Sequence, residues 1–78
     1  MAVFKIETTP EEHEKVLQAL RVIGNKTASV AMIADEAQMT QNRTRYTLVD
    51  LEESGKIKKN LVRAFNEKYK RYSYEVVE

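Results

Sequence analysis

The feature that most restricts the fold of this chain is the short distance between two helical patterns in its middle. Ser29 precedes an apolar stripe made by Val30, Ile33, Ala34 and Ala37, and Thr40 precedes a second pattern anchored by Leu48 and Leu51. Serine and threonine favour the N-cap position, so each pattern has its own start signal. Only a few residues separate Ala37 from Thr40, and two helices joined by so tight a turn have to cross at a steep angle.

A further helix is predicted upstream of this pair. Thr9 is placed to cap it, Pro10 suits the first helical position and Glu12 completes a capping box. Apolar residues then recur at helical spacing, namely Val16, Leu17, Leu20 and Ile23, and Gly24 is a natural C-terminal stop. We therefore expect a core helix between Thr9 and Gly24.

Beyond Gly55 the apolar residues alternate as they do in strands. Ile57, Leu61 and Phe65 are predicted to share one strand face, with Lys59 and Arg63 on the same face at the edge of the core. Tyr72, Tyr74 and Val76 alternate in the same way, and the polar segment 66–70 between the two runs favours a turn. The pattern predicts a β-hairpin. The opening segment VFKIE, residues 3–7, also alternates and is predicted as an additional strand.

The length of 78 residues is that of one small domain, and we take residues 1–78 as a single unit. Three helices followed by a hairpin make an α+β fold. The net charge is only +1, but residues 55–78 carry seven lysines and arginines against three glutamates, a local net charge of +4. A basic segment of this kind indicates a surface for an anionic partner, although lysines also protect exposed strand edges from aggregation.

The charges of the predicted helix over residues 40–55 run against its dipole. Arg43 and Arg45 lie in its first turns, and acidic residues lie in its last turns. The N-terminus of a helix is partially positive, so each misplaced charge costs about 0.3–1 kcal/mol at low salt. We interpret both arginines as contacts for an anionic partner and expect that removing either leaves stability unchanged or slightly improved. The alternative is a surface ion pair with Asp35 or Glu36 of the preceding helix.

The sequence offers little for catalysis or metal binding. It has no cysteine, and its one histidine, His13, has no second histidine or cysteine with which to share a metal, so we interpret it as a solvated surface residue. Ser54 lacks the surroundings of a nucleophile, and two glycines are too few for a phosphate-binding loop. We expect no enzymatic activity, no metal and no cofactor.

The next question is whether the sequence contains a targeting signal or a membrane span. The first residues, MAVFKIETTP, lack the basic opening and apolar run of a signal peptide, and no segment has the ~20 apolar residues of a membrane span. We therefore expect a soluble, cytoplasmic protein with no membrane partner. There is no long dimerisation helix, and a monomer and a homodimer both remain open.

The span SVAMIADEAQMTQNRTRYTLVDLEESGKI and the basic hairpin after it resemble a winged helix-turn-helix DNA-binding domain. The resemblance covers residues 11–77 and is carried by the caps Ser29 and Thr40, by IADEA, by RYTLVDLEESGKI and by the hairpin. RYxLxxLExxG followed by a lysine-rich strand is similar to small bacterial regulators of fimbrial operons and to MarR-like domains. The resemblance implies a three-helix bundle with a C-terminal wing. One departure is Thr44, where such helices usually have an apolar residue, so we expect a loosely packed first turn.

In such domains the third helix enters the major groove and the wing reaches a neighbouring groove or the backbone. With Leu48 and Leu51 buried, steps of about 100° per residue point Asn42, Tyr46 and Val49 away from the core. The predicted DNA-binding residues are Gln41, Asn42, Arg43, Arg45 and Tyr46 in the third helix and Lys68, Lys70 and Arg71 in the wing. Asparagine suits adenine, arginine suits guanine or phosphate, and valine suits the thymine methyl group.

Several of these residues have plainer explanations. Gln41 and Asn42 also favour a helix start, and Tyr46 and Val49 also suit a patch for a protein partner. The tyrosines of the hairpin, Tyr69, Tyr72 and Tyr74, more commonly pack on a sheet than stack on bases. The leading hypothesis is sequence-specific binding to double-stranded DNA, in transcriptional regulation in a bacterium, phage or plasmid. The alternative is a winged helix that acts as a protein–protein interaction module.

Overall fold

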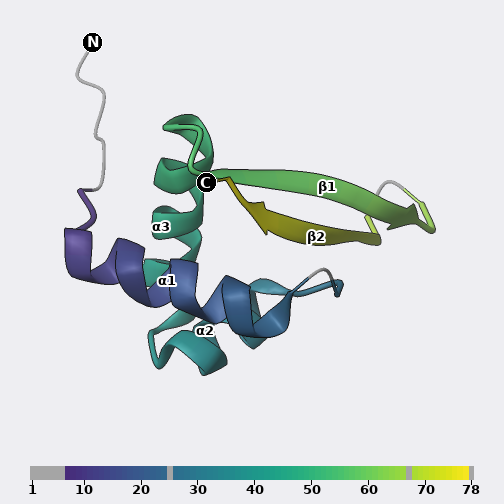
Figure 1. Ribbon diagram of the computed structural model, residues 1–78. Helices are drawn as coiled ribbons and strands as arrows, with labels where there is room; N and C mark the ends of the chain where they lie inside the picture. Colours follow the sequence, from purple (N-terminus) through teal and green to yellow (C-terminus); the bar gives the residue numbers. More distant parts are fainter. Residues whose placement is uncertain (1–6, 25, 67, 78) are drawn as a thin grey trace, which may run out of the picture.

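The computed structural model describes residues 7–24, 26–66 and 68–77, and within them the chain forms three helices and a two-stranded antiparallel sheet (Figure 1). The helices are α1 (Pro10–Ile23), α2 (Val30–Ala37) and α3 (Gln41–Glu53), and the strands are β1 (Ile57–Ala64) and β2 (Lys70–Val76). The helices pack against one another, and the hairpin extends from the C-terminal end of α3. The predicted α+β fold, three helices followed by a hairpin, is confirmed.

All three predicted helix starts are confirmed. Oγ1 of Thr9 accepts a hydrogen bond from the backbone N–H of Glu12 (3.1 Å), and the Glu12 carboxylate accepts one from the Thr9 backbone N–H (3.0 Å). Ser29 and Thr40 cap α2 and α3 by accepting from the backbone N–H three residues further on. These bonds satisfy N–H groups that have no acceptor within the helix, so the start of each helix is encoded locally.

The turn between α2 and α3 contains a residue in the left-handed conformation. Gln38 has φ 57° and ψ 46°, and the backbone N–H of Met39 donates to the carbonyl of Ala34 (2.9 Å). Glycine is the usual residue at such a position, because a side chain there is strained. This conformation reverses the chain within residues 38–40, so that α3 packs against α2.

The core is one contiguous cluster between the helices and the root of the hairpin. Its buried members are Val16, Ala19, Leu20, Ala28, Ile33, Ala37, Leu48, Leu51, Ile57 and Tyr74. All three helices and both strands contribute to it. Leu48 and Leu51 are 5% and 0% exposed, which confirms the helical phase predicted for α3.

The first turns of α3 are tightly packed, so the expectation of a loose start at Thr44 is wrong. Thr44 and Thr47 are both fully buried. Oγ1 of Thr44 donates to the carbonyl of Thr40 (2.8 Å), and Oγ1 of Thr47 donates to the carbonyl of Arg43 (2.7 Å). A buried hydroxyl is costly only when it is unpaired. Each threonine therefore fills the core with its methyl group and satisfies its hydroxyl within its own helix.

The strands form the predicted antiparallel hairpin. One face carries the pairs Ile57 with Val76, Lys59 with Tyr74 and Leu61 with Tyr72. At the root of the hairpin this face is buried against the helices, since Ile57 and Tyr74 are 3% and 8% exposed. The link between α1 and α2 is also attached to β2, through a bridge of Thr27 with Ser73 and a hydrogen bond from Ala28 N–H to the Tyr72 carbonyl (3.0 Å). The sequence pattern did not predict this attachment.

A bulge in β1 changes which residues share a face. The register shifts between Leu61 and Arg63, where Val62 is an extra residue, and Arg63 pairs with Arg71. A shift of one residue moves the following side chains to the opposite face. The prediction of one face from Ile57 to Phe65 that includes Arg63 is therefore wrong beyond Leu61. Leu61 and Phe65 are each 56% exposed and do not reach the core.

Upstream of α1 the structure describes only residues 7–9. The additional strand predicted at residues 3–7 lies outside the described residues except for Glu7, which belongs to no strand. Among the helices that the structure describes, none combines the length and the apolar character needed to cross a membrane.

Candidate nucleic-acid interface

One face of α3 is exposed, and it carries four of the five residues predicted for this helix. Gln41, Asn42 and Arg45 are exposed, and Tyr46 is 36% exposed. Asn42 and Arg45 lie together, because Nη1 of Arg45 donates to Oδ1 of Asn42 (3.3 Å). Val49 continues this face and is 48% exposed. The face therefore presents amide, guanidinium and apolar groups of the kind that contact base edges in the major groove.

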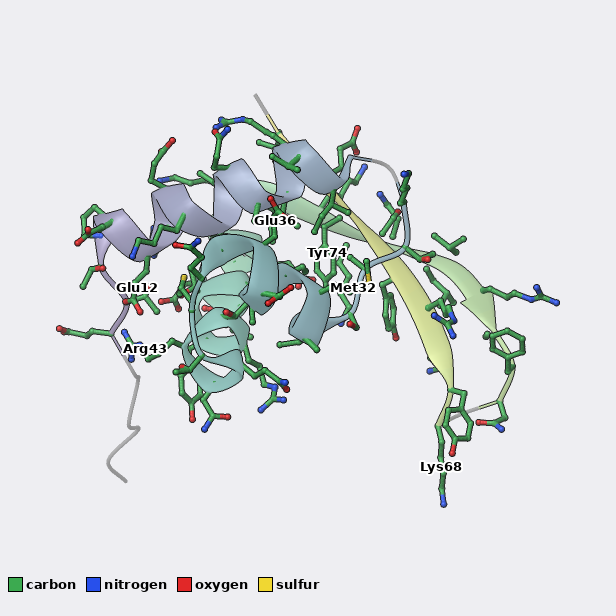
Figure 2. The ribbon with its side chains drawn as sticks, turned by 90° about the horizontal axis from the view of Figure 1, so that it is seen from below. Glu12, Met32, Glu36, Arg43, Lys68 and Tyr74 are labelled. Carbon is green, nitrogen blue, oxygen red and sulfur yellow. The ribbon has the colours of Figure 1, made fainter. Side chains whose placement is uncertain are left out.

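Arg43, the fifth predicted residue, is turned toward α1 (Figure 2). Its Nε donates to Oε2 of Glu12 (2.8 Å), and its Nη2 donates to Oε1 of Glu12 (2.6 Å) and to the carbonyl of Glu7 (3.0 Å). The two bonds to the carboxylate make a bidentate pair, a strong arrangement for arginine. The side chains of Arg43 and Glu12 are 37% and 18% exposed. Hydrogen bonds from Arg43 lower the pKa of Glu12 from 4.5 to about 2.

This ion pair explains how α3 tolerates a cation in its first turn. Glu12 supplies the negative charge that the helix N-terminus lacks, and it also completes the capping box of α1. Arg43 therefore does form an ion pair, but the alternative was wrong about the partner, which is Glu12 of α1 and not Asp35 or Glu36 of α2. Glu12 and Arg43 are 31 residues apart in the sequence, so no local pattern indicated the contact.

A second contact between the start of α1 and α3 involves His13, which the sequence pattern suggested was solvated. Nε2 of His13 lies 2.6 Å from Oγ1 of Thr8, and this hydroxyl donates to Oδ2 of Asp50 (2.6 Å). The hydroxyl has one proton, which it shares with Asp50, so it accepts the bond from the Nε2–H of His13. His13 is half-buried, and the expectation of a solvated residue is wrong. The segment before α1 is thereby attached to the last turns of α3.

The three cations predicted for the wing lie at the far end of the hairpin. Lys68, Lys70 and Arg71 are all exposed, and Lys68 projects from the end of the hairpin in Figure 2. Oδ1 of Asn66 accepts hydrogen bonds from the backbone N–H groups of Lys68 (2.8 Å) and Tyr69 (2.9 Å). An asparagine side chain that bonds the backbone two and three residues on shapes a turn. The turn predicted at residues 66–70 therefore holds the cations at the tip.

The three hairpin tyrosines have different surroundings. Tyr74 is buried at the root of the hairpin, and burial raises the pKa of its phenol. Tyr72 is half-buried, and Nζ of Lys59 lies 4.1 Å above its ring in a cation–π contact. These two residues fit the sheet-packing explanation. Tyr69, in the turn, is 67% exposed, and packing does not account for it.

The helix and the wing lie on the same side of the molecule. In Figure 2, α1 runs along one side, and α3 and the end of the hairpin that carries Lys68 lie toward the other. A helix presented directly after a tight turn, with a hairpin beside it, is the arrangement of a winged helix-turn-helix domain. The described part of the chain has this fold.

Comparison with known proteins agrees with this class. The chain is similar to the crystal structure of ZitR from Lactococcus lactis, described as a zinc-responsive MarR family member, with a TM-score of 0.58 and 18% sequence identity. The match covers 100% of this chain and 49% of that chain, so this chain spans about half the length of its structural neighbour. No protein-family model and no curated protein matches the sequence. The likeness confirms the winged-helix resemblance of the sequence at the level of the fold.

A zinc response is described for ZitR. In the part of this chain that the structure describes, no three histidine, cysteine, aspartate or glutamate side chains gather in a way that holds a metal ion.

Proposed function

We propose that this protein binds double-stranded DNA in a sequence-specific manner and regulates transcription in a bacterium, or in a phage or plasmid of one. The observation that carries the proposal is the exposed face of α3, which presents Gln41, Asn42, Arg45 and Tyr46. The major groove of B-DNA admits one α-helix, and each base pair presents a distinct pattern of donors and acceptors there. The winged-helix fold shared with a MarR family member supports the same function.

Each residue of this face has a role in the proposal. Asn42 forms a bidentate pair with adenine, and Arg45 binds guanine or a phosphate. Because these two side chains are hydrogen bonded in the free protein (3.3 Å), DNA binding exchanges that bond for contacts to the duplex. Tyr46 and Val49 supply apolar contact. Arg43 acts through Glu12, because this pair holds the start of α3 against α1.

The wing supplies the contacts that do not depend on sequence. Lys68, Lys70 and Arg71 bind phosphates in the proposal, and phosphate contacts fix the orientation of a protein on the duplex. Their exposure at the end of the hairpin and the local net charge of +4 over residues 55–78 support this role.

The proposal is tested by binding to one selected and one random duplex over a range of salt concentrations. Replacing Lys68, Lys70 and Arg71 with glutamine should weaken binding to both duplexes alike and lower the log–log salt slope by about one unit per lost contact. Asn42→Ala should reduce the preference for the selected duplex and leave the slope unchanged. If binding by the wild type does not depend on salt, the proposal is wrong.

A protein-interaction module is the second candidate, and the apolar part of the α3 face favours it. Tyr46 and Val49 are 36% and 48% exposed, and neighbouring exposed apolar side chains often mark an interface with a protein. The overall net charge of +1 is also low for a DNA-binding protein. Equally weak binding of both duplexes by the wild type, Asn42→Ala and the wing variant would favour this candidate.

A further inference from the structure

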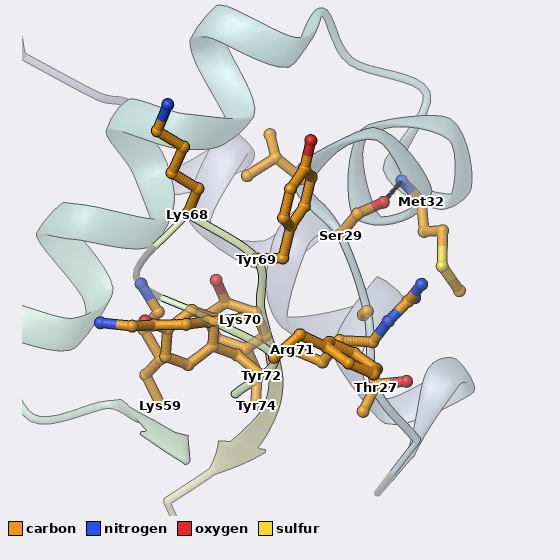
Figure 3. Close-up of a pocket in the computed structure, with 13 residues that line it drawn as sticks. Thr27, Ser29, Met32, Lys59, Lys68, Tyr69, Lys70, Arg71, Tyr72 and Tyr74 are labelled. Carbon is orange, nitrogen blue, oxygen red and sulfur yellow. Dashed lines mark hydrogen bonds between the residues drawn. The ribbon is translucent and has the colours of Figure 1, made fainter. Parts of the chain in front are cut away.

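A groove between the start of α2 and the hairpin has a distinctive lining (Figure 3). Its volume is about 560 Å³, within the range of sites that hold small organic groups. One wall is formed by residues 27–30 and Met32, and the other by the hairpin between Lys59 and Tyr74. The groove is therefore separate from the exposed face of α3.

The charged side chains in the described lining are all cations. They are Lys59, Lys68, Lys70 and Arg71. The opposite wall contains the first turn of α2, where Ser29 caps the N–H of Met32 (3.1 Å), and a helix start is partially positive. A concave site with cations on one wall and a helix start on the other favours an anionic ligand.

Aromatic rings also line this groove. Tyr74 is buried, and the rings of Tyr72 and Phe65 are each covered by a cation, Lys59 at 4.1 Å and Arg63 at 4.7 Å. The Tyr69 ring is more exposed than that of Phe65, 67% against 56%, and it stands in the groove beside Ser29 in Figure 3. An exposed ring surrounded by cations is a platform for stacking a nucleic-acid base.

We propose that this groove binds a segment of single-stranded DNA, with one unpaired base stacked on Tyr69 and the flanking phosphates bound by the hairpin cations. A base inside a duplex has both faces covered by its neighbours and is unable to stack on a side chain without leaving the duplex. The ring therefore requires an unpaired base, which goes beyond recognition of a duplex by α3. The choice of DNA rests on the proposed function.

The spread of the cations favours a strand over a free nucleotide. Lys59 is near the root of the hairpin, opposite Tyr74, whereas Lys68 lies in the turn at its far end. A row of cations suits the repeated phosphates of a strand, and single-stranded DNA is bound in this way by grooves that combine cations with aromatic rings. A free nucleotide has its phosphates at one position only.

The decisive variants are Tyr69→Leu and Tyr69→Phe, because they separate stacking from apolar contact. The probe is a short oligothymidylate, and the control ligand is an abasic oligomer of the same length. Tyr69→Leu should weaken binding to oligothymidylate about tenfold, Tyr69→Phe should bind like the wild type, and both should bind the abasic oligomer like the wild type. Circular dichroism should show unchanged folding, because Tyr69 is exposed in a turn. An equal loss on the abasic oligomer, or no loss on either, overturns the inference.

A matched pair of charge variants tests the phosphate contacts. Lys70→Gln should weaken binding to both oligomers, because Lys70 lines the groove. Lys15→Gln should change neither, because Lys15 is exposed on α1 and does not line this groove. Equal effects of the two substitutions would mean that binding follows net charge alone, and would overturn the placement of the strand in this groove.

Failure of this inference is distinguishable from failure of duplex recognition. Asn42→Ala should alter the preference among duplexes and leave oligothymidylate binding unchanged. Tyr69→Leu should weaken oligothymidylate binding and leave the preference among duplexes unchanged. Selective duplex binding without measurable binding to oligothymidylate would overturn the inference and leave the proposed function standing. Oligothymidylate binding that depends on Tyr69, without any preference among duplexes, would support the inference and overturn the proposed function.

Discussion

Arg43 and Arg45 are a matched pair with different surroundings. Both oppose the dipole of α3, but Arg43 is held by Glu12 and Arg45 lies on the exposed face beside Asn42. We expect Arg43→Ala to lower the melting temperature, because Glu12 loses its counter-ion and the start of α3 loses its attachment to α1. Arg45→Ala should leave it unchanged or slightly raised. Thermal unfolding of both variants checks this, and equal melting temperatures would contradict it. For Arg43 this prediction differs from the one made from the sequence, which was that removing the side chain leaves stability unchanged or slightly improved.

Glu12 makes this attachment sensitive to acid. Because Arg43 lowers its pKa from 4.5 to about 2, the folded state binds this proton less readily than the unfolded state. Because the pKa is lower in the folded state, the ionised Glu12 stabilises the fold at pH values above its unfolded-state pKa of 4.5. This stabilisation is lost as the pH falls from about 4.5 toward 2. Glu12→Gln should therefore be less stable than the wild type at neutral pH, with a difference that shrinks over this interval. Urea unfolding at a series of pH values measures it, and a constant difference would refute the role of the carboxylate.

The turn between α2 and α3 contains a strained residue whose replacement should raise the stability of the protein. Gln38 adopts φ 57°, a region in which a residue with a Cβ atom is strained by about 1–2 kcal/mol. Glycine removes this strain but makes the unfolded chain more flexible, so the net gain for Gln38→Gly should be about 1 kcal/mol or less. Chemical denaturation measures the gain. Gln38→Ala, which keeps the Cβ atom, serves as the control and should show no such gain.

The helices were predictable because their signals are local. Thr9, Ser29 and Thr40 each cap an N–H three residues on, so a few neighbouring residues contain the information. The exposed face of α3 followed from the same periodicity, once Leu48 and Leu51 were taken as buried. The position of these elements relative to one another depends on contacts between distant residues, which a local pattern does not contain.

Three features show where local patterns failed. Glu12 and Arg43 meet across 31 residues, and Thr27, in the link between α1 and α2, bridges to Ser73 of β2. The bulge at Val62 depends on the register of two strands, whereas alternation within β1 alone assumes that every residue is paired. The groove beside Tyr69 was missed for the same reason, because its two walls come from α2 and the hairpin.

For the whole molecule, the stability to be expected is small. Domains have about 0.05–0.15 kcal/mol per residue, which for this length gives a total of about 4–12 kcal/mol. Leu51 is fully buried at the junction of the helices and the hairpin root, and Leu51→Ala should cost about 2–5 kcal/mol. We expect this variant to be largely unfolded or to melt far below the wild type. Val49→Ala, on the exposed face of α3, should melt like the wild type, and similar behaviour of the two variants would mean that the phase of α3 is wrong.

The bulge in the wing has a consequence for insertions and deletions. β1 contains one residue more than β2, and the extra residue, Val62, determines that Arg63 faces Arg71. Deleting Val62 would remove the bulge and restore unbroken alternation, while Leu61 stays paired with Tyr72 and Arg63 with Arg71, so no side chain would change face. Adding a residue to the loop at 65–69 would leave both strands as they are. Wings of different lengths are therefore compatible with this hairpin when the change falls in the loop or at the bulge, because neither change alters which residues of β1 and β2 are paired.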